Sequence, residues 1–113
     1  MVKLLLQQPR VDPTAKNNEA IREASQYGHV EVVKLLLKQS GVDPTAKNNY
    51  AIRLASENGY LEVVKLLLQQ PRVDPTAKDN YAIRWASRNG NLEVVKLLSS
   101  FKRKAAPKAQ LRK

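Results

Sequence analysis

The chain has 113 residues, with 20 Lys and Arg against 10 Asp and Glu, one His and no Cys. This length favours a single domain that buries a core without metal or disulfide support, and the absence of Cys excludes disulfides, a thiolate nucleophile and a Cys-based metal site. No apolar run approaches the roughly 20 residues that span a bilayer, and the N-terminus shows no secretory cleavage site. We therefore expect an intracellular protein, cytoplasmic or nuclear, that is neither secreted nor inserted in a membrane.

The chain opens with a Val-Lys-Leu-Leu-Leu run at residues 2–6 that returns further along. The hexapeptide Val-Asp-Pro-Thr-Ala-Lys begins at Val11, Val42 and Val73, so successive units are 31 residues apart. A fixed period of this length indicates a solenoid of stacked units. We therefore expect a repeat domain at 1–98 and a basic C-terminal helix end and tail at 99–113. The repeat domain would comprise a half repeat at 1–10 and repeats at about 11–41, 42–72 and 73–98.

The sequence of each unit predicts two helices, and the second unit is taken as the example. Asn49 is expected to cap the first helix by accepting a hydrogen bond from a first-turn N–H, and small residues follow on one face. Gly59 suits the left-handed position that ends this helix. The apolar run 61–68 predicts a second helix, which the same helix of neighbouring units must cover on both flanks. An Asn-Gly pair also favours a strand hairpin, but the periodicity of the flanking residues is helical.

Polar stretches separate the helix pairs, and residues 70–79 are an example. Their prolines end the preceding helix and favour extended backbone, so we expect a projecting finger or hairpin-like loop. The Asp that recurs in these stretches predicts a turn that accepts backbone N–H groups rather than a metal ladder; it stands at Asp12, Asp43 and Asp74. The Arg that recurs in the first helices is expected to tie each helix to its adjacent loop rather than to bind phosphate; it stands at Arg22, Arg53 and Arg84.

Residues 55–68 are similar to the Ala-Ala-x-x-Gly-His-x-x-Val-Val-x-x-Leu-Leu core of ankyrin repeats, and Gly28-His29 supplies the Gly-His pair once. The resemblance covers residues 1 to about 98, although the unit is short and residues 50–53 replace the family's Thr-Pro-Leu-His opening. It implies an all-α, ankyrin-like helical repeat solenoid of stacked helix-turn-helix units with projecting loops or short hairpins. A tetratricopeptide or other helical repeat is the alternative, which the Val-Asp-Pro stretch disfavours because such helix pairs are joined by short turns.

The sequence contains no arrangement typical of an enzyme. The single histidine, His29, has no counterpart in the other units, and a structural hydrogen bond in its turn is a better interpretation than catalysis. The four glycines form no phosphate-binding loop. We therefore expect a non-enzymatic protein that uses neither a cofactor nor a metal.

Positions that differ between the units are candidates for partner contact, because stacking requires the other positions to be alike. In ankyrin repeats the first helices and the loop tips are the usual contact surface, so the resemblance implies that a protein partner binds there. The predicted contacts are Tyr50, Leu54, Tyr81, Trp85 and Arg88, with Glu19 and Glu23 as an acidic shoulder that favours a basic segment of the partner. We call these seven residues the ridge. Leu54 and Trp85 can also be core residues: the two interpretations are equal for Leu54, whereas a partly exposed role is preferred for Trp85 and the tyrosines.

The ends of the chain carry separate expectations. The tail holds six basic residues and no acidic one, namely Lys102, Arg103, Lys104, Lys108, Arg112 and Lys113. It could be a solvated end, an import signal, or a weak, sequence-independent binder of nucleic acid or another anionic surface. The N-terminal half repeat lacks its first helix, which predicts fraying or end-to-end self-association, whereas Ser99 replaces a repeated Leu as expected of a terminal cap. The chain could also be a structural fragment of a longer repeat array.

Overall fold

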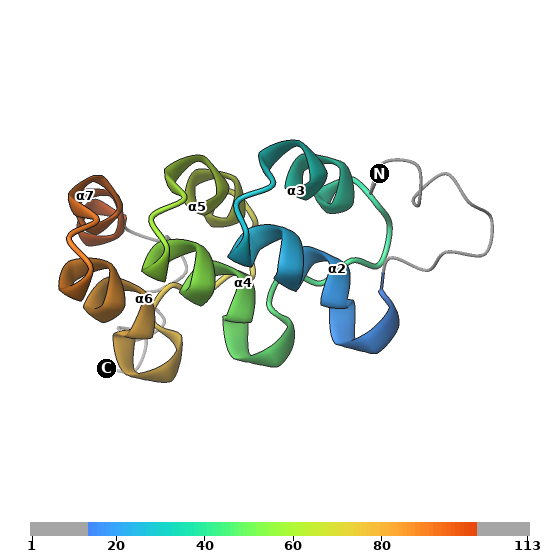
Figure 1. Cartoon of the computed structure of the whole chain (residues 1–113). Helices are drawn as coiled ribbons and strands as arrows, with labels where there is room; N and C mark the ends of the chain where they lie inside the picture. Colours follow the sequence, from blue (N-terminus) through green and yellow to red (C-terminus); the bar gives the residue numbers. More distant parts are fainter. Residues whose placement is uncertain (1–13, 102–113) are drawn as a thin grey trace.

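The computed structural model describes residues 14–101. This part of the chain folds into six helices: α2 (Ala15–Gln26), α3 (Val30–Leu37), α4 (Ala46–Glu57), α5 (Leu61–Leu68), α6 (Ala77–Arg88) and α7 (Leu92–Ser100). Figure 1 shows α2, α4 and α6 in one row and α3, α5 and α7 in a second row. The expected all-α stack of helix pairs is therefore confirmed. The boundary between repeat domain and tail stays a prediction.

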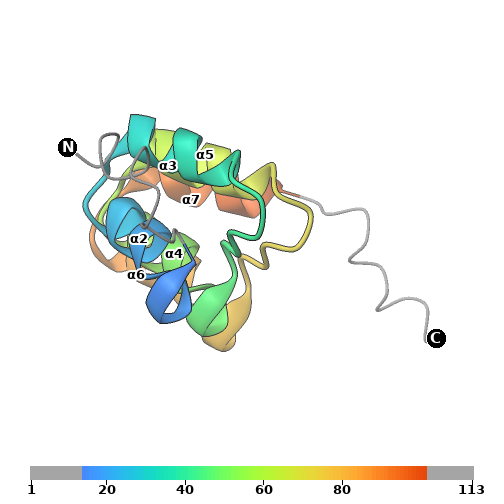
Figure 2. The same cartoon turned by 90° about the vertical axis from the view of Figure 1, so that its right-hand side faces the viewer.

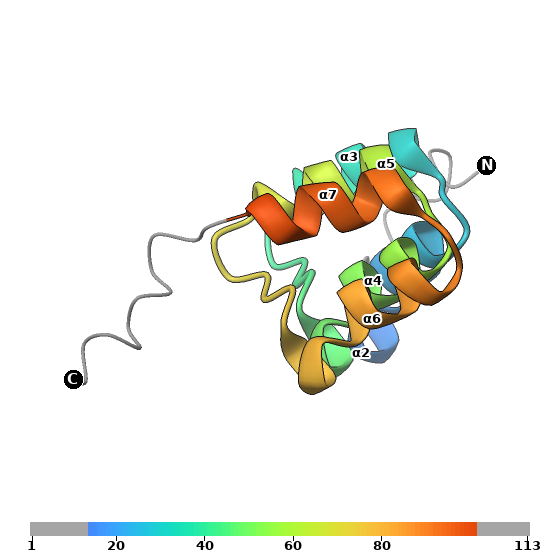
Figure 3. The ribbon, with the colours of Figure 1, turned by 90° about the vertical axis from the view of Figure 1, so that its left-hand side faces the viewer.

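The two end views show the two rows of helices facing each other (Figures 2 and 3). The core lies between these rows and draws residues from every unit. Ile52 of α4 and Val63 and Leu67 of α5 are completely buried. Ala51 and Ala55 of α4 are also fully buried, and their small side chains let α4 pack closely between α2 and α6. Each unit thus supplies part of one continuous core, which is the packing that makes stacked repeats stable.

The outer side of the third unit is more exposed than the same side of the second. Ser56 is completely buried, whereas Ser87 at the equivalent position is exposed. Leu68 is 8% exposed, and Ser99, which replaces it in α7, is exposed. A polar residue at this position suits a helix that no further unit covers among residues 14–101. The half repeat in which self-association was expected lies outside the described residues.

The loops between units are not hairpins, and no strand forms within residues 14–101. Val73 is 1% exposed, so this part of the loop packs into the core instead of projecting. Three consecutive left-handed residues then open each first helix; in α4 they are Lys47, Asn48 and Asn49, with φ near 60°. The left-handed conformation costs an L-residue roughly 1–2 kcal/mol, and Asn and Asp tolerate it best. This tolerance explains the Lys-Asn-Asn and Lys-Asp-Asn sequences at these turns.

The recurring arginine holds each left-handed turn in place. Arg53 donates from Nε to the Asn48 carbonyl at 3.0 Å and from Nη2 to the Lys47 carbonyl at 3.1 Å. Arg22 and Arg84 make the same two contacts in their own units. The expected tie between helix and loop is confirmed, and its acceptors are backbone carbonyls rather than the recurring Asp.

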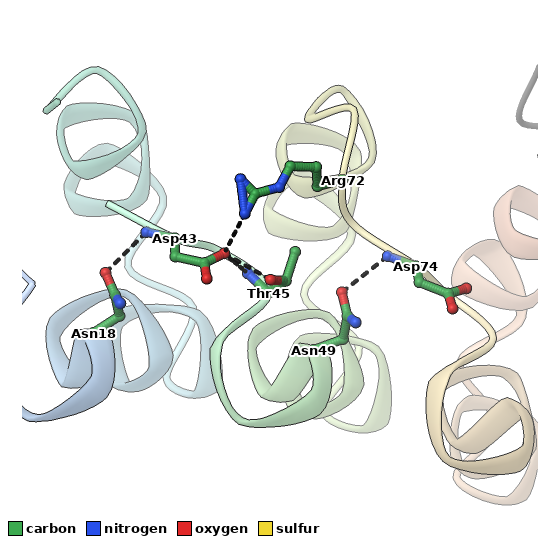
Figure 4. A network of polar contacts seen from close by, with 6 residues as sticks. All are labelled: Asn18, Asp43, Thr45, Asn49, Arg72 and Asp74. Carbon is green, nitrogen blue, oxygen red and sulfur yellow. Dashed lines mark hydrogen bonds and ion pairs between the residues drawn. The ribbon is translucent and has the colours of Figure 1, made fainter. Parts of the chain in front are cut away.

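The expected N-cap role of Asn49 is wrong. Asn49 has a left-handed backbone, whereas a capping residue is typically in the β region, and its Oδ1 instead accepts the N–H of Asp74 in the next unit at 2.9 Å. Figure 4 shows this contact and its equivalent from Asn18 to Asp43. The recurring asparagine therefore connects one unit to the loop of the next.

The recurring Asp forms the expected turn. Asp43 Oδ1 accepts hydrogen bonds from the backbone N–H of Thr45 at 2.9 Å and from the Thr45 hydroxyl at 2.6 Å (Figure 4). The hydroxyl contact is the main reason why the pKa of Asp43 lies below its ordinary value; partial burial opposes it, and the Thr45 N–H and the nearby Arg72 add to it. The ion pair between Arg72 and Asp43 is long, 3.9 Å, and largely exposed, so it contributes little to stability.

Candidate functional site

The two tyrosines of the ridge are held by the unit that precedes each of them. The Tyr50 hydroxyl donates to Oε1 of Gln26 at 2.8 Å, and the Tyr81 hydroxyl donates to Oε1 of Glu57 at 2.5 Å. Both tyrosines are half-buried. Gln26 and Glu57 stand at the variable position that Arg88 occupies in the third unit. The structure shows that they are the acceptors that fix the tyrosines.

The Tyr81 hydroxyl is less acidic than that of an ordinary tyrosine. Partial burial, followed by the hydrogen bond and the negative charge of Glu57, raises the pKa of Tyr81 from its ordinary value of 10.0 to about 12, and Arg53 opposes this rise. Tyr81 is therefore a neutral hydrogen-bond donor throughout the physiological range.

An alternating series of arginines and aromatic rings crosses the first helices; we call it the arginine–aromatic row. The Arg22 guanidinium carbon lies 5.4 Å from the centre of the Tyr50 ring. The Arg53 guanidinium carbon lies 5.6 Å from the Tyr50 ring and 5.0 Å from the Tyr81 ring. At such distances a cation is attracted to the ring face by roughly 0.5–1 kcal/mol at exposed sites. The contacts therefore fix the rings and the guanidinium groups relative to one another.

The row continues to the third unit. The Trp85 ring centre lies 5.9 Å from that of Tyr81, and the Arg88 guanidinium carbon lies 4.8 Å from the Trp85 ring. Trp85 is half-buried and Arg88 is exposed. The structure thus brings Tyr50, Tyr81, Trp85 and Arg88 together with Arg22 and Arg53.

Leu54, Glu19 and Glu23, which were also predicted as site residues, take no part in the ring and cation contacts of the row. Leu54 is half-buried, so its side chain belongs wholly neither to the core nor to the surface. Glu19 is half-buried and Glu23 is exposed. Neither carboxylate forms an ion pair within the part of the chain that the structure describes. The basic tail predicted as a site lies outside that part.

Sequence reasoning missed the two arginines of the row because strict recurrence assigned them to structure alone. The available signal was the spacing of Tyr50 and Arg53, which puts them on one face of α4 at i and i+3. The contacts of Tyr50 with Arg22 and of Tyr81 with Arg53 join different units. They depend on stacking and could not be obtained from spacing alone.

An open groove of about 600 Å³ lies beside the row. We call it the turn groove; it is lined by Arg22, Lys47, Asn48, Tyr50, Arg53 and Lys78. The arginines belong to first helices, and the lysines belong to the left-handed turns of the following unit. Four of the six lining residues are cations and none is acidic, so the groove has a positive potential.

The described residues contain no group of three or more potential metal ligands among His, Asp and Glu side chains. The expected hydrogen bond of the His29 side chain is not found within residues 14–101; the ring is exposed and lies 6.4 Å from that of Tyr27. Between Thr14 and Phe101 no helix has the length and apolar character needed to cross a membrane.

Comparison with known families agrees with the fold. Residues 44–110 match the family model of ankyrin repeats in three copies, and residues 20–49 match that of a single ankyrin repeat. A search of curated proteins gave no match. Ankyrin repeats are in general protein–protein interaction modules, and the family is generally non-enzymatic. The first match alone covers more than half of the chain, so the chain belongs to the ankyrin repeat family.

Proposed function

We propose that this chain is a non-enzymatic interaction module that binds a protein partner through its ridge and the neighbouring left-handed turns. The observation that carries the proposal is the arginine–aromatic row, which extends over three consecutive units. Trp, Tyr and Arg are the residues most enriched at the energetic centres of protein interfaces. Here they are concentrated on first helices, the elements that ankyrin repeats use for binding.

Part of the row is already held by hydrogen bonds of the folded chain, and this favours tight binding. The Tyr50 and Tyr81 hydroxyls are each hydrogen-bonded to the preceding unit, and Arg53 is hydrogen-bonded to two carbonyls of its own turn. Immobilising a flexible side chain on binding costs roughly 0.5–1.5 kcal/mol. For these side chains much of that entropy is already lost on folding, so less is lost on binding.

Trp85 is the proposed anchor of the interface. It is half-buried between Tyr81 and Arg88, so part of a large ring stays accessible while the rest is fixed. At the other end of the ridge, the carboxylates of Glu19 and Glu23 would favour a basic segment of the partner. Tyr27, which is 59% exposed in the turn between α2 and α3, supplies an aromatic control outside the ridge.

The test compares the full chain with Trp85→Ala and Tyr27→Ala in a pull-down, followed by calorimetry with the purified partner. Trp85→Ala should weaken binding by ~2 kcal/mol or more, with little change in unfolding, whereas Tyr27→Ala should leave binding unchanged. If Trp85 is instead a core residue, Trp85→Ala will lower the free energy of unfolding by ~3–5 kcal/mol. Unchanged binding by a folded Trp85→Ala protein would refute the proposal.

The basic tail motivates a second candidate function, which is binding to nucleic acid or another anionic surface. The observation in its favour is that all six charges of residues 99–113 are positive. Binding of this kind should be independent of sequence and should weaken steeply with salt. Deleting residues 102–113 should abolish it and leave capture of the protein partner intact. Nucleic-acid binding that survives the deletion with the same salt dependence would exclude the tail as its cause.

A further inference from the structure

The turn groove contains four cations that no acidic group of the described chain neutralises. Arg22, Lys47, Arg53 and Lys78 form no ion pair within residues 14–101. The lysines of the second helices differ, since Lys34 and Lys65 lie 3.5 and 3.6 Å from Glu31 and Glu62. The four positive charges are therefore concentrated in one groove, without an ion pair to any acidic side chain of the described residues.

The arginines of the groove are held in an orientation that leaves one edge available. A guanidinium carries five N–H donors. Arg53 uses its Nε and one Nη2 donor for the two carbonyls of its turn, and Arg22 does the same. The remaining donors, on Nη1 and on the second N–H of Nη2, form the other edge of each group and make no hydrogen bond to the described residues. That edge has the fork geometry that binds a carboxylate through two parallel hydrogen bonds.

The cations of the groove recur from one unit to the next. Arg22 and Arg53 come from successive first helices, and Lys47 and Lys78 come from successive left-handed turns. Packed helices lie roughly 8–10 Å apart, so Arg22 of α2 and Arg53 of α4, which both lie near the Tyr50 ring, are separated by about one such step. An extended peptide rises roughly 3.3 Å per residue, and acidic residues about three positions apart match this separation.

We propose that the turn groove binds an acidic segment of a partner protein in extended conformation, with carboxylates on the successive arginines Arg22 and Arg53 and on the lysines of the turns, Lys47 and Lys78. This inference rests on the proposed function, because it describes one part of the partner that the ridge would bind. The groove opens beside Tyr50, which belongs to both surfaces. A partner can therefore contact the ridge and the groove together.

A nucleic acid fits the groove less well than an acidic peptide. Proteins that bind single strands combine a basic channel with aromatic rings on which bases stack. The aromatic residue of this groove, Tyr50, already has two guanidinium groups within 5.6 Å of its ring centre, and its hydroxyl is bonded to Gln26. Its ring is thus occupied, and the groove offers charge without a free stacking surface.

The test measures binding of a fluorescein-labelled peptide of about six Glu residues, which spans about 20 Å when extended, by fluorescence anisotropy. A Gln peptide of equal length and a single-stranded oligothymidylate of equal charge serve as comparison probes. The groove variant is the double change Lys47→Gln and Lys78→Gln in the full chain. The matched control is Lys34→Gln and Lys65→Gln, which removes the same charge from second helices and keeps the same tail.

The groove variant should bind the Glu peptide about tenfold more weakly than the parent chain, since each exposed charge pair contributes up to about 1 kcal/mol. The control should stay within about twofold of the parent, and the Gln peptide should not bind. An equal loss of peptide affinity in both variants would attribute binding to net charge or the tail. Unchanged peptide affinity in the groove variant would place the binding site elsewhere. A larger effect on the oligonucleotide than on the peptide would identify a nucleic-acid site. Each of these three results overturns the proposal.

Failure of this inference is distinguishable from failure of the proposed function. If the groove variant binds the peptide normally while Trp85→Ala still weakens capture of the protein partner, the acidic-segment site is refuted and the interaction module stands. If Trp85→Ala has no effect on the partner but the groove variant loses the peptide, the ridge is refuted and the groove remains a site for acidic chains.

Discussion

Ser56 lies at the centre of the stack and should destabilise the protein in which it occurs. It is completely buried, and its hydroxyl oxygen has no hydrogen-bond partner among residues 14–101. The change Ser56→Ala removes that hydroxyl and keeps the Cβ atom. Ser87 occupies the same position in the third unit but is exposed. Ser87→Ala is therefore a control for the same chemical change in the same type of helix.

The two variants share one effect and differ in another. Ala is favoured over Ser inside a helix by roughly 0.5 kcal/mol, and both variants gain this term. Only Ser56→Ala also removes a buried, unpaired hydroxyl, which costs roughly 1–3 kcal/mol. The void left by one oxygen atom offsets this gain by only a few tenths of a kcal/mol. We therefore expect Ser56→Ala to stabilise the fold by ~1–2 kcal/mol more than Ser87→Ala.

Urea unfolding followed by circular dichroism measures this difference. A change in the midpoint with a constant slope identifies a change in stability alone. Ser25 is buried and unpaired in the same way, so Ser25→Ala is an independent repetition in the first unit. If Ser56→Ala and Ser25→Ala raise stability no more than Ser87→Ala, their hydroxyls are hydrogen-bonded and the reasoning is refuted.

Two further predictions concern the contacts between units. Asn49→Ala should lower the free energy of unfolding by ~1 kcal/mol more than Asn80→Ala. Both variants lose an asparagine from a left-handed turn, but only Asn49 accepts the N–H of Asp74. Equal losses in urea unfolding would show that this contact contributes nothing. Because the pKa of Tyr81 is raised to about 12, the unfolded chain releases this proton first, and stability should fall as the pH rises from about 10 to about 12. In a pH titration followed by tyrosinate absorbance, one tyrosine should ionise at a higher pH than the others, and Tyr81→Phe should lack it. If Tyr81→Phe instead lacks a tyrosine with an ordinary pKa, the role of Glu57 is contradicted.

The repeat period and the hydrophobic pattern were sufficient to predict the helix pairs and the continuous core, because both depend on features within one unit. The first turn of each first helix was not predictable in this way. Asn49 suits both an N-cap and a left-handed turn, and the atom it contacts belongs to Asp74, in the loop of the next unit. The contact of Tyr81 with Arg53 also joins two units. Sequence patterns describe each unit well, but the partners of Asn49 and Tyr81 depend on how the units stack.

Strict recurrence was used to separate structural positions from functional ones, and the arginines indicate where that rule is too strong. Arg53 must recur because the left-handed turn needs two hydrogen bonds to its carbonyls. The same two bonds fix the guanidinium and leave its other edge facing no described acceptor. Since every stacked unit repeats this arrangement, the structural requirement itself creates cations at a regular spacing. A residue can therefore recur for the sake of the fold and still supply a binding surface, and we infer that Arg22 and Arg53 do both.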